Sequence, residues 1–363
     1  MSGIRRIALI PGDGIGPEVT AVGCALLEWY RDVRGLPIEL WPLSLGAEHW
    51  LATGEGLSEG LLEQIRGEAA AVLLGALGDP RIPGHEHARS ILFGLRFGLD
   101  LYANVRPVRA LCERLVPLVG RRCADVDIVV FRENTEGLYA GIGGQLRRGS
   151  PAEIAIEEDV NTRLGVERIL RAAFAYARRE RKRLCLADKS NALRHAHELW
   201  QRVFRELKQE YDDVASEHLY IDALCYELVR DPGRFQVIVS CNLFGDIVSD
   251  LVAALGGGLG LAPSASLHPG GNVPGLFEPV HGSAPELAGR GLANPLAMLR
   301  TVGLLLEELG FEGQRAAIDR ASAEALEARE CTPDAGGSLS TREAGEAVLS
   351  RLRENLGAPG AVW

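Results

Sequence analysis

The chain has 363 residues, of which 47% are hydrophobic, so it is long enough for two domains with sizeable cores. Its 49 acidic residues outnumber its 39 lysines and arginines, which gives a formal net charge of −10. This balance argues against a nucleic-acid or anionic-membrane surface, although a few focused arginines can still bind a small anion.

The seven cysteines are odd in number and form no C-x-x-C pair. A zinc site and a disulfide framework are therefore both disfavoured, and a reducing cytoplasm fits best. The first residues lack the apolar run of a signal peptide, and no stretch approaches the length of a membrane-spanning helix. We therefore expect a cytoplasmic protein with neither a membrane nor a nucleic acid as partner.

Short apolar runs alternate with helical patterns along the chain. The run at 4–10 predicts a buried strand that ends at a Pro-Gly turn, and the periodic pattern at 18–33 predicts a helix after it. Further strands are predicted at 70–77, 126–132, 183–189, 216–222 and 235–241, with helices near 162–181 and 194–210. This alternation indicates an α/β architecture, and the Gly-rich segment at about 140–161 indicates a projecting arm or hairpin.

Two aspartates lie four residues apart in NLFGDIVSD, inside a run that is otherwise apolar. Like charges at this spacing repel by roughly 0.2 to 0.5 kcal/mol, and a lone buried carboxylate costs several kcal/mol more. Asn242, Asp246 and Asp250 form one polar stripe, so a positive group should meet them. Asp222, at a predicted strand end, adds a third carboxylate, and such oxygens suit Mg²⁺ or Mn²⁺. We therefore predict a metal site, against the alternative of a solvated helix face.

Seven blocks occur in an order that resembles one family: IPGDGIGPEV, LDLYANVRP, FRENTEGLYAG, ADKSNAL, NLFGDIVSD, APSASL and FEPVHGSAPELAGRGLANP. They are similar to the metal-dependent β-decarboxylating dehydrogenases of the isocitrate/isopropylmalate dehydrogenase family, across essentially the whole chain. The resemblance implies a two-domain α/β subunit without a G-x-G-x-x-G Rossmann fingerprint. Its large cofactor-binding domain would comprise 1–99 and 256–363, and its small dimerisation, metal and catalytic domain would comprise 100–255. The glycines of GDGIGP are interpreted as turn positions.

The resemblance also implies roles for individual residues. Arg96, Arg106 and Arg132 match the arginines that bind the substrate carboxylates, a task that guanidinium forks suit. Tyr139 and Lys189 match the acid and the base. Lys189 and Asp222 would reach the neighbouring subunit's site, which implies a homodimer with shared active sites. Taken alone, each of these residues could equally be an ordinary core or surface residue.

The cofactor implied by the resemblance is NAD. In relatives the residue after Pro285 selects the cofactor, and here it is Glu286, which can accept hydrogen bonds from a ribose hydroxyl and would repel a 2′-phosphate. The alternative is an exposed loop carboxylate. The implied cofactor contacts are Asn191, His281, Gly282, Ser283, Ala284, Glu286, Leu287 and Asn294.

In relatives the choice of substrate depends largely on the helix and loop just before Arg96, here residues 78–97. Leu92 and Phe93 occupy positions that face the isopropyl group in isopropylmalate enzymes, which favours an apolar C3 substituent. Ser90 instead matches the serine with which isocitrate enzymes bind an extra carboxylate, and Arg89 replaces a glutamate. The histidines of HEH (85–87) are interpreted as a solvated loop or the edge of the substrate site.

The sequence thus predicts NAD-dependent oxidative decarboxylation of a 3-substituted (R)-malate to a 2-oxo acid and CO₂. The favoured substrate is 3-isopropylmalate, and the alternatives are isocitrate, homoisocitrate, tartrate or D-malate. A noncatalytic regulatory subunit is the alternative from another class, against which the retention of Tyr139, Lys189 and the three aspartates speaks. A dehydrogenase without decarboxylation is disfavoured by the missing Rossmann fingerprint and by Tyr139.

Overall fold

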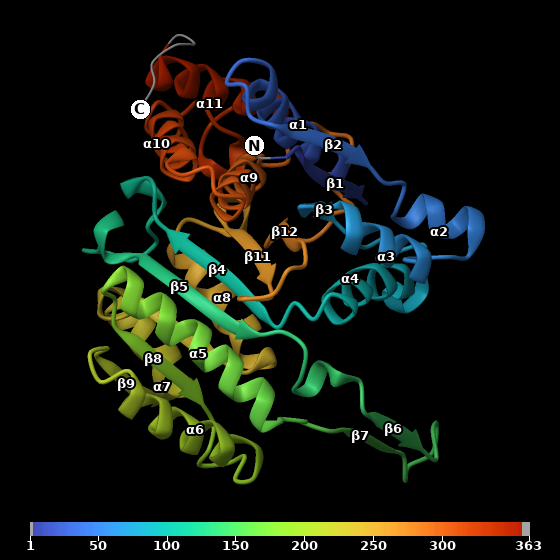
Figure 1. The fold of residues 1–363 in the computed structure, drawn as a ribbon, viewed down its shortest axis with the longest axis vertical. Helices are drawn as coiled ribbons and strands as arrows, with labels where there is room; N and C mark the ends of the chain where they lie inside the picture. The colour runs from blue at the N-terminus through green and yellow to red at the C-terminus, as the bar shows by residue number, and fades with distance from the viewer. Residues whose placement is uncertain (1–2, 358–363) are drawn as a thin grey trace.

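A ten-stranded sheet runs through the whole molecule in the computed structural model, which describes residues 3–357 (Figure 1). The strand order is β2-β1-β3-β12-β11-β4-β5-β10-β8-β9. The strands are β1 (Arg5–Gly12), β2 (Ile38–Pro42), β3 (Ala71–Ala76), β4 (Ala103–Arg109), β5 (Asp127–Glu133), β8 (Leu184–Asp188), β9 (Ser216–Tyr220), β10 (Val237–Ser240), β11 (Pro263–Leu267) and β12 (Gly275–Pro279). Most neighbours are parallel, but β11 runs antiparallel to both β12 and β4, and β4 runs antiparallel to β5.

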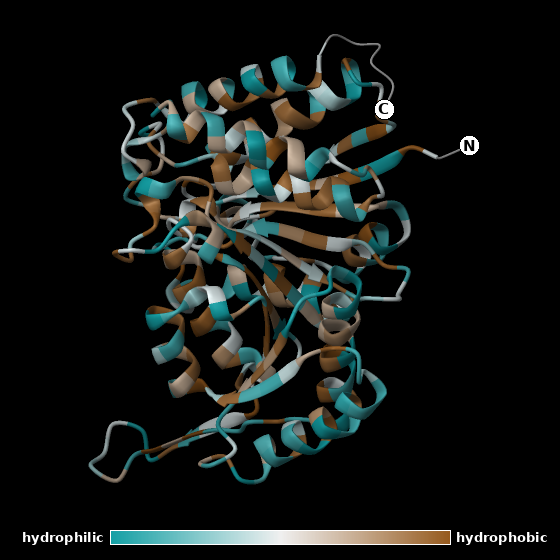
Figure 2. Cartoon of the chain, turned by 90° about the vertical axis from the view of Figure 1, so that its left-hand side faces the viewer, coloured by the Kyte–Doolittle hydropathy of each residue, from teal (hydrophilic) through white to brown (hydrophobic). Residues whose placement is uncertain are grey.

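Helices cover both faces of this sheet. They are α1 (Gly16–Asp32), α2 (Ala47–Thr53), α3 (Glu59–Glu68), α4 (Glu86–Gly98), α5 (Arg163–Glu180), α6 (Ala196–Glu210), α7 (Ile221–Arg230), α8 (Asn242–Leu255), α9 (Leu296–Glu308), α10 (Gln314–Glu327) and α11 (Thr341–Leu356). Central strands such as β3 are buried at every position, because helices exclude water from both faces. Figure 2 shows the resulting apolar strands between helices with hydrophilic outer faces.

Four hydrophobic clusters fill the space between the sheet and the helices. Two of them pack around β1, β3 and β12 with α1, α4 and α9, and the other two pack around β5, β8 and β10 with α5, α6 and α8. We propose that the two predicted domains meet between β11 and β4. In this proposal the chain would cross between the domains at 99–100 and at 255–256.

The predicted arm is a two-stranded antiparallel hairpin that projects from the body (Figure 1). It consists of β6 (Gly143–Leu146) and β7 (Ile154–Glu157), and its foot is closed by a bridge between Gly137 and Val160. Within residues 3–357, no helix is both long and apolar enough to cross a bilayer.

Gly12, the last residue of β1, and Gly14, just after it, are confirmed as turn positions, whereas Gly16 is the first residue of α1. Gly12 and Gly14 have φ angles of 74° and 57°. A Cβ atom on Gly12 would lie 1.9 Å from the carbonyl oxygen of Ala76, and one on Gly14 would lie 2.0 Å from that of Ser283. Only glycine fits both the dihedral angle and the close approach, and this approach brings the 283 loop against the end of β1.

Candidate active site

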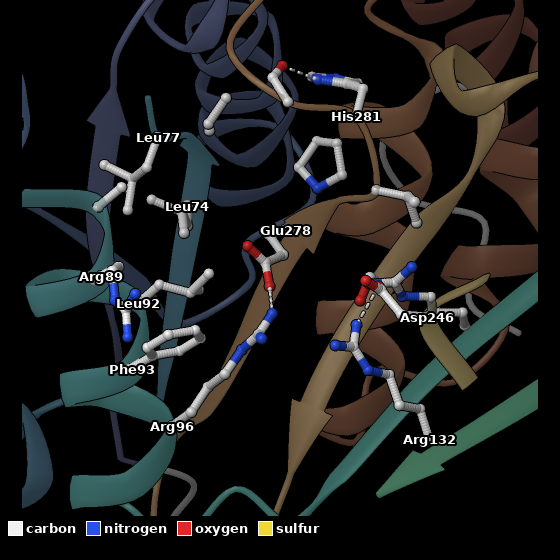
Figure 3. A pocket seen from close by; sticks show the side chains of 18 of the residues that line it. Leu74, Leu77, Arg89, Leu92, Phe93, Arg96, Arg132, Asp246, Glu278 and His281 are labelled. Atoms are coloured by element: carbon white, nitrogen blue, oxygen red, sulfur yellow. Dashed lines mark hydrogen bonds and ion pairs between the residues drawn. The ribbon is translucent and has the colours of Figure 1, made fainter. Parts of the chain in front are cut away.

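A cleft of about 300 Å³ opens beside α4, at the ends of the central strands (Figure 3). Most of the predicted substrate residues line it, and two predicted cofactor residues join them. The lining includes Arg89, Leu92, Phe93, Arg96, Arg106, Arg132, Tyr139, Asp246, Ser264, Glu278, His281 and Gly282, with Leu74 and Leu77. Strands β4 and β5, helices α4 and α8 and the loop after β12 therefore converge on one site.

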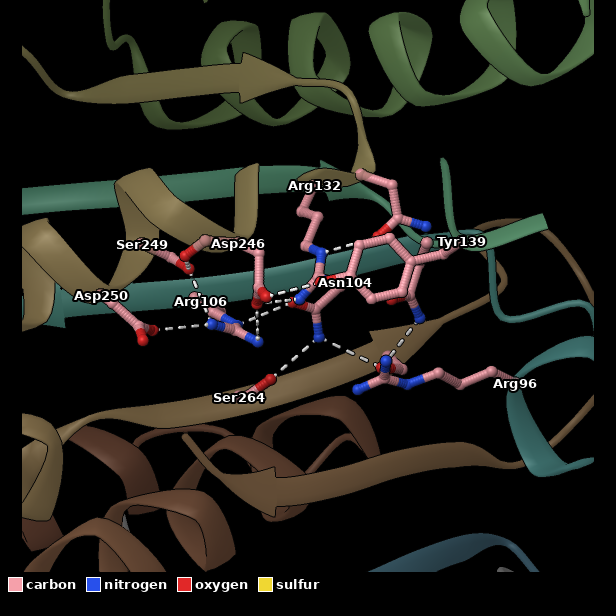
Figure 4. A network of polar contacts seen from close by, with 12 residues as sticks. Arg96, Asn104, Arg106, Arg132, Tyr139, Asp246, Ser249, Asp250 and Ser264 are labelled. Atoms are coloured by element: carbon pink, nitrogen blue, oxygen red, sulfur yellow. Dashed lines mark hydrogen bonds and ion pairs between the residues drawn. The ribbon is translucent and has the colours of Figure 1, made fainter. Parts of the chain in front are cut away.

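Two buried arginines meet the aspartate stripe of α8 (Figure 4). Arg132 binds Asp246 and donates to Oδ1 of Asn242 at 3.0 Å. Arg106 lies 3.3 Å from Oδ1 of Asp246 and 3.2 Å from Oδ1 of Asp250. The prediction that a positive group meets these carboxylates is confirmed, and in this chain the groups are guanidiniums.

Burial sets the charge properties of this cluster. It lowers the pKa of Arg132 to about 10, with the neighbouring Arg106 as the next cause, and it also lowers the pKa of Arg106. It raises the pKa of Asp250, an effect that Arg106 opposes. Desolvation disfavours the charged form of each of these side chains. A bound anion near the arginines, or a bound cation near the aspartates, would offset that cost.

Tyr139 lies on a short turn after β5, with its hydroxyl directed at α8. The hydroxyl donates to Oδ2 of Asp246 at 3.0 Å, and the ring lies 5.1 Å from the guanidinium carbon of Arg132. Burial, followed by the charge of Asp246, raises the tyrosine's pKa. The side chain therefore carries its proton at neutral pH.

Arg96 has a carboxylate partner that the sequence reasoning missed. Its Nη2 donates to Oε1 of Glu278 on β12 at 2.9 Å, with both side chains largely buried. The Nε of Arg96 is buried without a hydrogen-bond partner in residues 3–357. Asn104 was also missed, although it lies in the quoted motif LDLYANVRP, and it accepts from Nε of Arg106 at 2.9 Å.

Lys189 and Asp222 lie together but apart from the other site residues. Their side chains form an ion pair of 2.5 Å, and the lysine's hydrogen bond lowers the pKa of Asp222. Asp222 lies in the first turn of α7, so the strand expected to reach it ends at Tyr220. No three His, Cys, Asp or Glu side chains in the described chain are grouped so that they could hold a metal ion. One chain thus brings together two of the three predicted aspartates.

The predicted cofactor residues lie mainly on the loop after β12. Ser283 is buried, Ala284 and Leu287 pack against the core, and Glu286 is exposed. His281 lines the cleft with its Nε2 buried and without a partner among the described residues, and burial lowers its pKa. Asn294 donates to Asp334 at 3.0 Å, and Asn191 is exposed on the loop that begins with Lys189.

Ser90 and His87 lie away from the positions expected of them. Ser90 is not among the residues that line the cleft. It faces Gly56, where an added Cβ would lie 2.3 Å from its Oγ. The interpretation of His87 as a solvated residue is wrong. His87 is fully buried, and its Nε2 lies 2.9 Å from Oδ2 of Asp13, whereas His85 is exposed.

Comparisons with known proteins place this chain in one family. The family model described as isocitrate/isopropylmalate dehydrogenase matches residues 6–348. A 3-isopropylmalate dehydrogenase of Thermobifida fusca is 47% identical and covers 96% of this chain and 98% of its own length. One from Frankia casuarinae is 46% identical, with 95% and 99% covered.

Solved structures agree with this assignment. Isocitrate dehydrogenase from Methylococcus capsulatus superposes with a TM-score of 0.86 at 37% identity, over 96% of this chain and all of that one. A β-decarboxylating dehydrogenase from Thermococcus kodakarensis has a TM-score of 0.78 at 35% identity, with 97% of each chain covered. The chain belongs to the isocitrate/isopropylmalate dehydrogenase family. The predicted family, fold and oxidoreductase class are confirmed.

Proposed function

We propose that the protein catalyses the NAD-dependent oxidative decarboxylation of a 3-substituted (R)-malate, with 3-isopropylmalate as the favoured substrate. The observation that carries this proposal is the convergence of Arg96, Arg106 and Arg132 on a cleft that also holds Tyr139 and Asp246. Buried guanidiniums that face a solvent-accessible cavity are suited to the carboxylates of a small dianion.

Charge balance supports a hydroxy-acid dianion together with a divalent cation. The three guanidiniums are matched by three carboxylates, those of Glu278, Asp246 and Asp250. A dianion added alone would leave two uncompensated negative charges in a partly buried site, and a dication added alone would leave two positive ones. Bound together, they keep the cluster neutral.

The metal would be Mg²⁺ or Mn²⁺, held by Asp246 and Asp250. Carboxylate oxygens are the ligands these ions prefer, and both side chains are partly exposed beside the cleft. When bound, such an ion acts as a Lewis acid toward the substrate's hydroxyl and carboxylate oxygens. In this chain the two aspartates project from successive turns of α8, which presents both carboxylates to one ligand.

A second copy of the chain would complete the site. Asp222 and Lys189 form an exposed pair that is not grouped with Asp246 and Asp250 within one chain. We propose a homodimer in which these two residues serve the neighbouring subunit's cleft. Asp222 would supply the third carboxylate, and Lys189 would exchange its aspartate contact for one with the substrate hydroxyl.

Two side chains would then move the protons. Lys189 would accept the proton of the C2 hydroxyl as hydride leaves for NAD, and it would need to be uncharged to do so. Tyr139 would protonate C3 after CO₂ is lost. Its raised pKa keeps the phenol protonated, and its hydrogen bond to Asp246 orients it over the cleft.

NAD would lie along the loop from 281 to 287. The unpartnered Nε2 of His281 is a buried polar atom that a bound ligand would satisfy. The predicted contacts of Gly282, Ser283, Ala284 and Leu287 lie on the same loop, with Asn294 beyond it, and Asn191 would come from the loop of Lys189. The exposed carboxylate of Glu286 favours NAD over NADP, because it repels a 2′-phosphate.

The substrate preference depends on the wall that α4 contributes. Leu92 and Phe93 line the cleft beside Leu74 and Leu77, so the space next to Arg96 is apolar. Such a wall suits an alkyl group at C3. The relatives named 3-isopropylmalate dehydrogenases support the same choice.

A tricarboxylate such as isocitrate or homoisocitrate is the second candidate, because Arg89 also lines the cleft. Its guanidinium carbon lies 5.7 Å from the centroid of the Phe93 ring, and it forms no ion pair with any residue in 3–357. An unpaired cation at the cleft is available to a third carboxylate.

The test is NADH formation with Mn²⁺ and a panel of 3-isopropylmalate, isocitrate, homoisocitrate, tartrate and D-malate, with CO₂ trapped in parallel. We expect 3-isopropylmalate to have the highest kcat/KM, with one CO₂ for each NADH. Preference for a tricarboxylate, abolished by Arg89→Ala, would select the second candidate. NADH without CO₂ would contradict decarboxylation, and no turnover of any substrate would point to a noncatalytic subunit.

The free cysteines fit a cytoplasmic location.

A further inference from the structure

His197, on α6, is a buried histidine in direct contact with the backbone of Lys189. It is 1% exposed, and its Nδ1 accepts the backbone N–H of Lys189 at 3.0 Å. Because an amide can only donate, Nδ1 carries no hydrogen and the ring hydrogen lies on Nε2. The ring is packed between Trp200 and Phe244, whose centroids lie 6.5 and 5.5 Å from its own. The acceptor is therefore held in a fixed place.

The other side of the ring faces the foot of the arm. Nε2 lies 3.7 Å from Oδ2 of Asp159, which is within ion-pair range but too far for a hydrogen bond, and it has no hydrogen-bond partner among the described residues. The nearby imidazole is the main cause that lowers the pKa of Asp159. Oδ1 of Asp159 accepts from Nδ2 of Asn161 at 2.9 Å, and Oδ1 of Asn161 accepts from Nε1 of Trp200 at 2.8 Å. Asn161 thus links the aspartate to α6.

Asp159 also adjoins the segment that carries Tyr139. The next residue, Val160, accepts the backbone N–H of Gly137 at 2.7 Å, two residues before the tyrosine. The imidazole therefore bonds to the Lys189 loop and lies beside the foot of the arm, which is in turn bonded to the Tyr139 turn.

We infer that His197 is a positioning residue for Lys189, through the imidazole tautomer whose Nδ1 accepts the lysine's backbone N–H. The inference rests on the proposed function, in which Lys189 accepts the hydroxyl proton. Lys189 follows the last residue of β8, and its carbonyl accepts from Ala192 and Leu193 at 2.9 and 2.8 Å. The contact with His197 is what fixes its backbone N–H. A displacement of about 1 Å can cost a factor on the order of 10² in rate.

Three variants separate positioning from plain core packing. His197→Leu removes the acceptor, whereas the side-chain oxygen of His197→Asn lies near the place of Nδ1 and can still accept. Phe204→Leu, in the same helix and 3% exposed, perturbs the core without touching Lys189. Urea unfolding is measured for all three, together with kcat and KM for the hydroxy acid and NAD.

We expect His197→Leu to lower kcat by a factor on the order of 10² with little change in either KM. His197→Asn should retain most of the wild-type kcat. Phe204→Leu should lower the urea midpoint at least as much as His197→Leu does, and its kcat should stay near that of the wild type. Equal kcat in His197→Leu and the wild type would overturn the inference. So would a folded His197→Asn as slow as His197→Leu.

Hydrogen exchange gives a readout that does not depend on turnover. The amide of Lys189 should be protected in the wild type and in His197→Asn but should exchange faster in His197→Leu, and unchanged exchange would contradict the inference. Lys189→Ala tests the proposed function separately. Full activity of that variant would remove the base assignment whatever His197 does. An inactive Lys189→Ala beside a fully active His197→Leu would remove only the positioning role.

Discussion

The hydroxyl of Tyr139 donates to Oδ2 of Asp246 at 3.0 Å, so the residue proposed as proton donor is bonded to a residue proposed as metal ligand. The other oxygen of Asp246 contacts Arg106 and Arg132. One carboxylate therefore links the tyrosine, the two arginines and the proposed metal position. The position of the phenol depends on the charge state of this cluster.

Tyr139→Phe should lower kcat for oxidative decarboxylation by roughly 10²- to 10⁴-fold, the usual contribution of general acid catalysis. Reduction of the 2-oxo product by NADH should be affected less, because that reaction does not protonate C3. The lost hydrogen bond should cost about 0.5 to 1.5 kcal/mol of unfolding free energy. Tyr211→Phe is the control, since its hydroxyl bonds to no described residue. Unchanged decarboxylation in Tyr139→Phe would contradict the acid role.

Asp250→Asn should weaken metal binding while changing the stability of the apo protein little. Asp250 is half exposed, and among the residues that the structure describes its carboxylate pairs with Arg106 alone. Arg106 keeps Asp246 as a partner in the variant, so the apo protein should lose less than about 1 kcal/mol. Saturating Mn²⁺ at about 100 times its Kd should stabilise the wild type by about 2.7 kcal/mol and the variant by much less. Thermal unfolding with and without Mn²⁺ measures this. Equal stabilisation of both proteins would remove the metal assignment.

Asp246→Asn should behave differently from Asp250→Asn. It leaves Arg132, which is 2% exposed, without its carboxylate, and breaking a buried pair costs about 3 to 5 kcal/mol, less here because Asp246 is partly solvated. Loss of metal-dependent activity in this variant therefore has to be read together with its urea midpoint.

Glu286→Lys should shift the cofactor preference toward NADP. The residue is exposed and forms no ion pair within 3–357, so the fold should tolerate the change. Replacing repulsion of a 2′-phosphate by attraction should change the ratio of kcat/KM values for NADP and NAD by about tenfold or more, which corresponds to about 1.4 kcal/mol. Glu312→Lys, an exposed site with the same change of charge, is the control. A ratio that moves equally in both variants would mean that the loop does not contact the adenosine.

Leu92→Asn tests the apolar wall. The new amide has no partner beside Phe93, so kcat/KM for 3-isopropylmalate should fall by roughly 10- to 200-fold. Activity toward isocitrate should rise relative to it. Leu51→Asn, on the outer side of α2, should change neither value. Full isopropylmalate activity in the Leu92→Asn variant would show that the C3 substituent lies elsewhere.

Asp159→Asn should destabilise the protein in a pH-dependent way. The folded-state pKa of Asp159 lies below its ordinary value of 3.8, mainly because of His197. The stabilisation by the charged form is therefore present above that value and is lost as pH falls through the lower folded pKa. Urea midpoints at fixed protein concentration should differ between variant and wild type from neutral pH to about pH 5, and converge below 3.8. Asp212→Asn, an exposed aspartate without a partner in the described chain, should show no such difference.

The periodicity of apolar residues predicted the secondary structure correctly where strands are apolar and helices have one buried face. The predicted strands at 70–77 and 126–132 correspond to β3 and β5, and the predicted helix at 162–181 corresponds to α5. Strand β11 was missed because its sequence, PSASL, has no apolar run. Its backbone pairs with β12 and β4, and Asn104 adds side-chain bonds to Ser264 and Ser266. Such a strand is recognisable only from its neighbours.

The contacts within the candidate site were also not predictable from local sequence. The aspartate stripe on α8 and the arginines on β4 and β5 could each be predicted, but their direct pairing depends on how the sheet brings 106, 132 and 246 together. His87 was misjudged for the same reason. Its partner Asp13 lies 74 residues earlier, and nothing in the local sequence HEH distinguishes a buried histidine from a solvated one.

The joint between β11 and β4 has a mechanical consequence. It contains three paired positions, as does the β12–β3 ladder, whereas the neighbouring β4–β5 ladder contains seven. We expect the sheet to bend most easily at such short ladders, and we propose the β11–β4 ladder, where the two proposed domains meet, as the hinge; its residues Arg106 and Ser264 line the cleft. Asn104 sits in the hinge and also accepts from Arg106. A carboxylate that draws Arg106 toward itself would pull directly on the hinge, so ligand charge and closure of the two halves should be mechanically coupled.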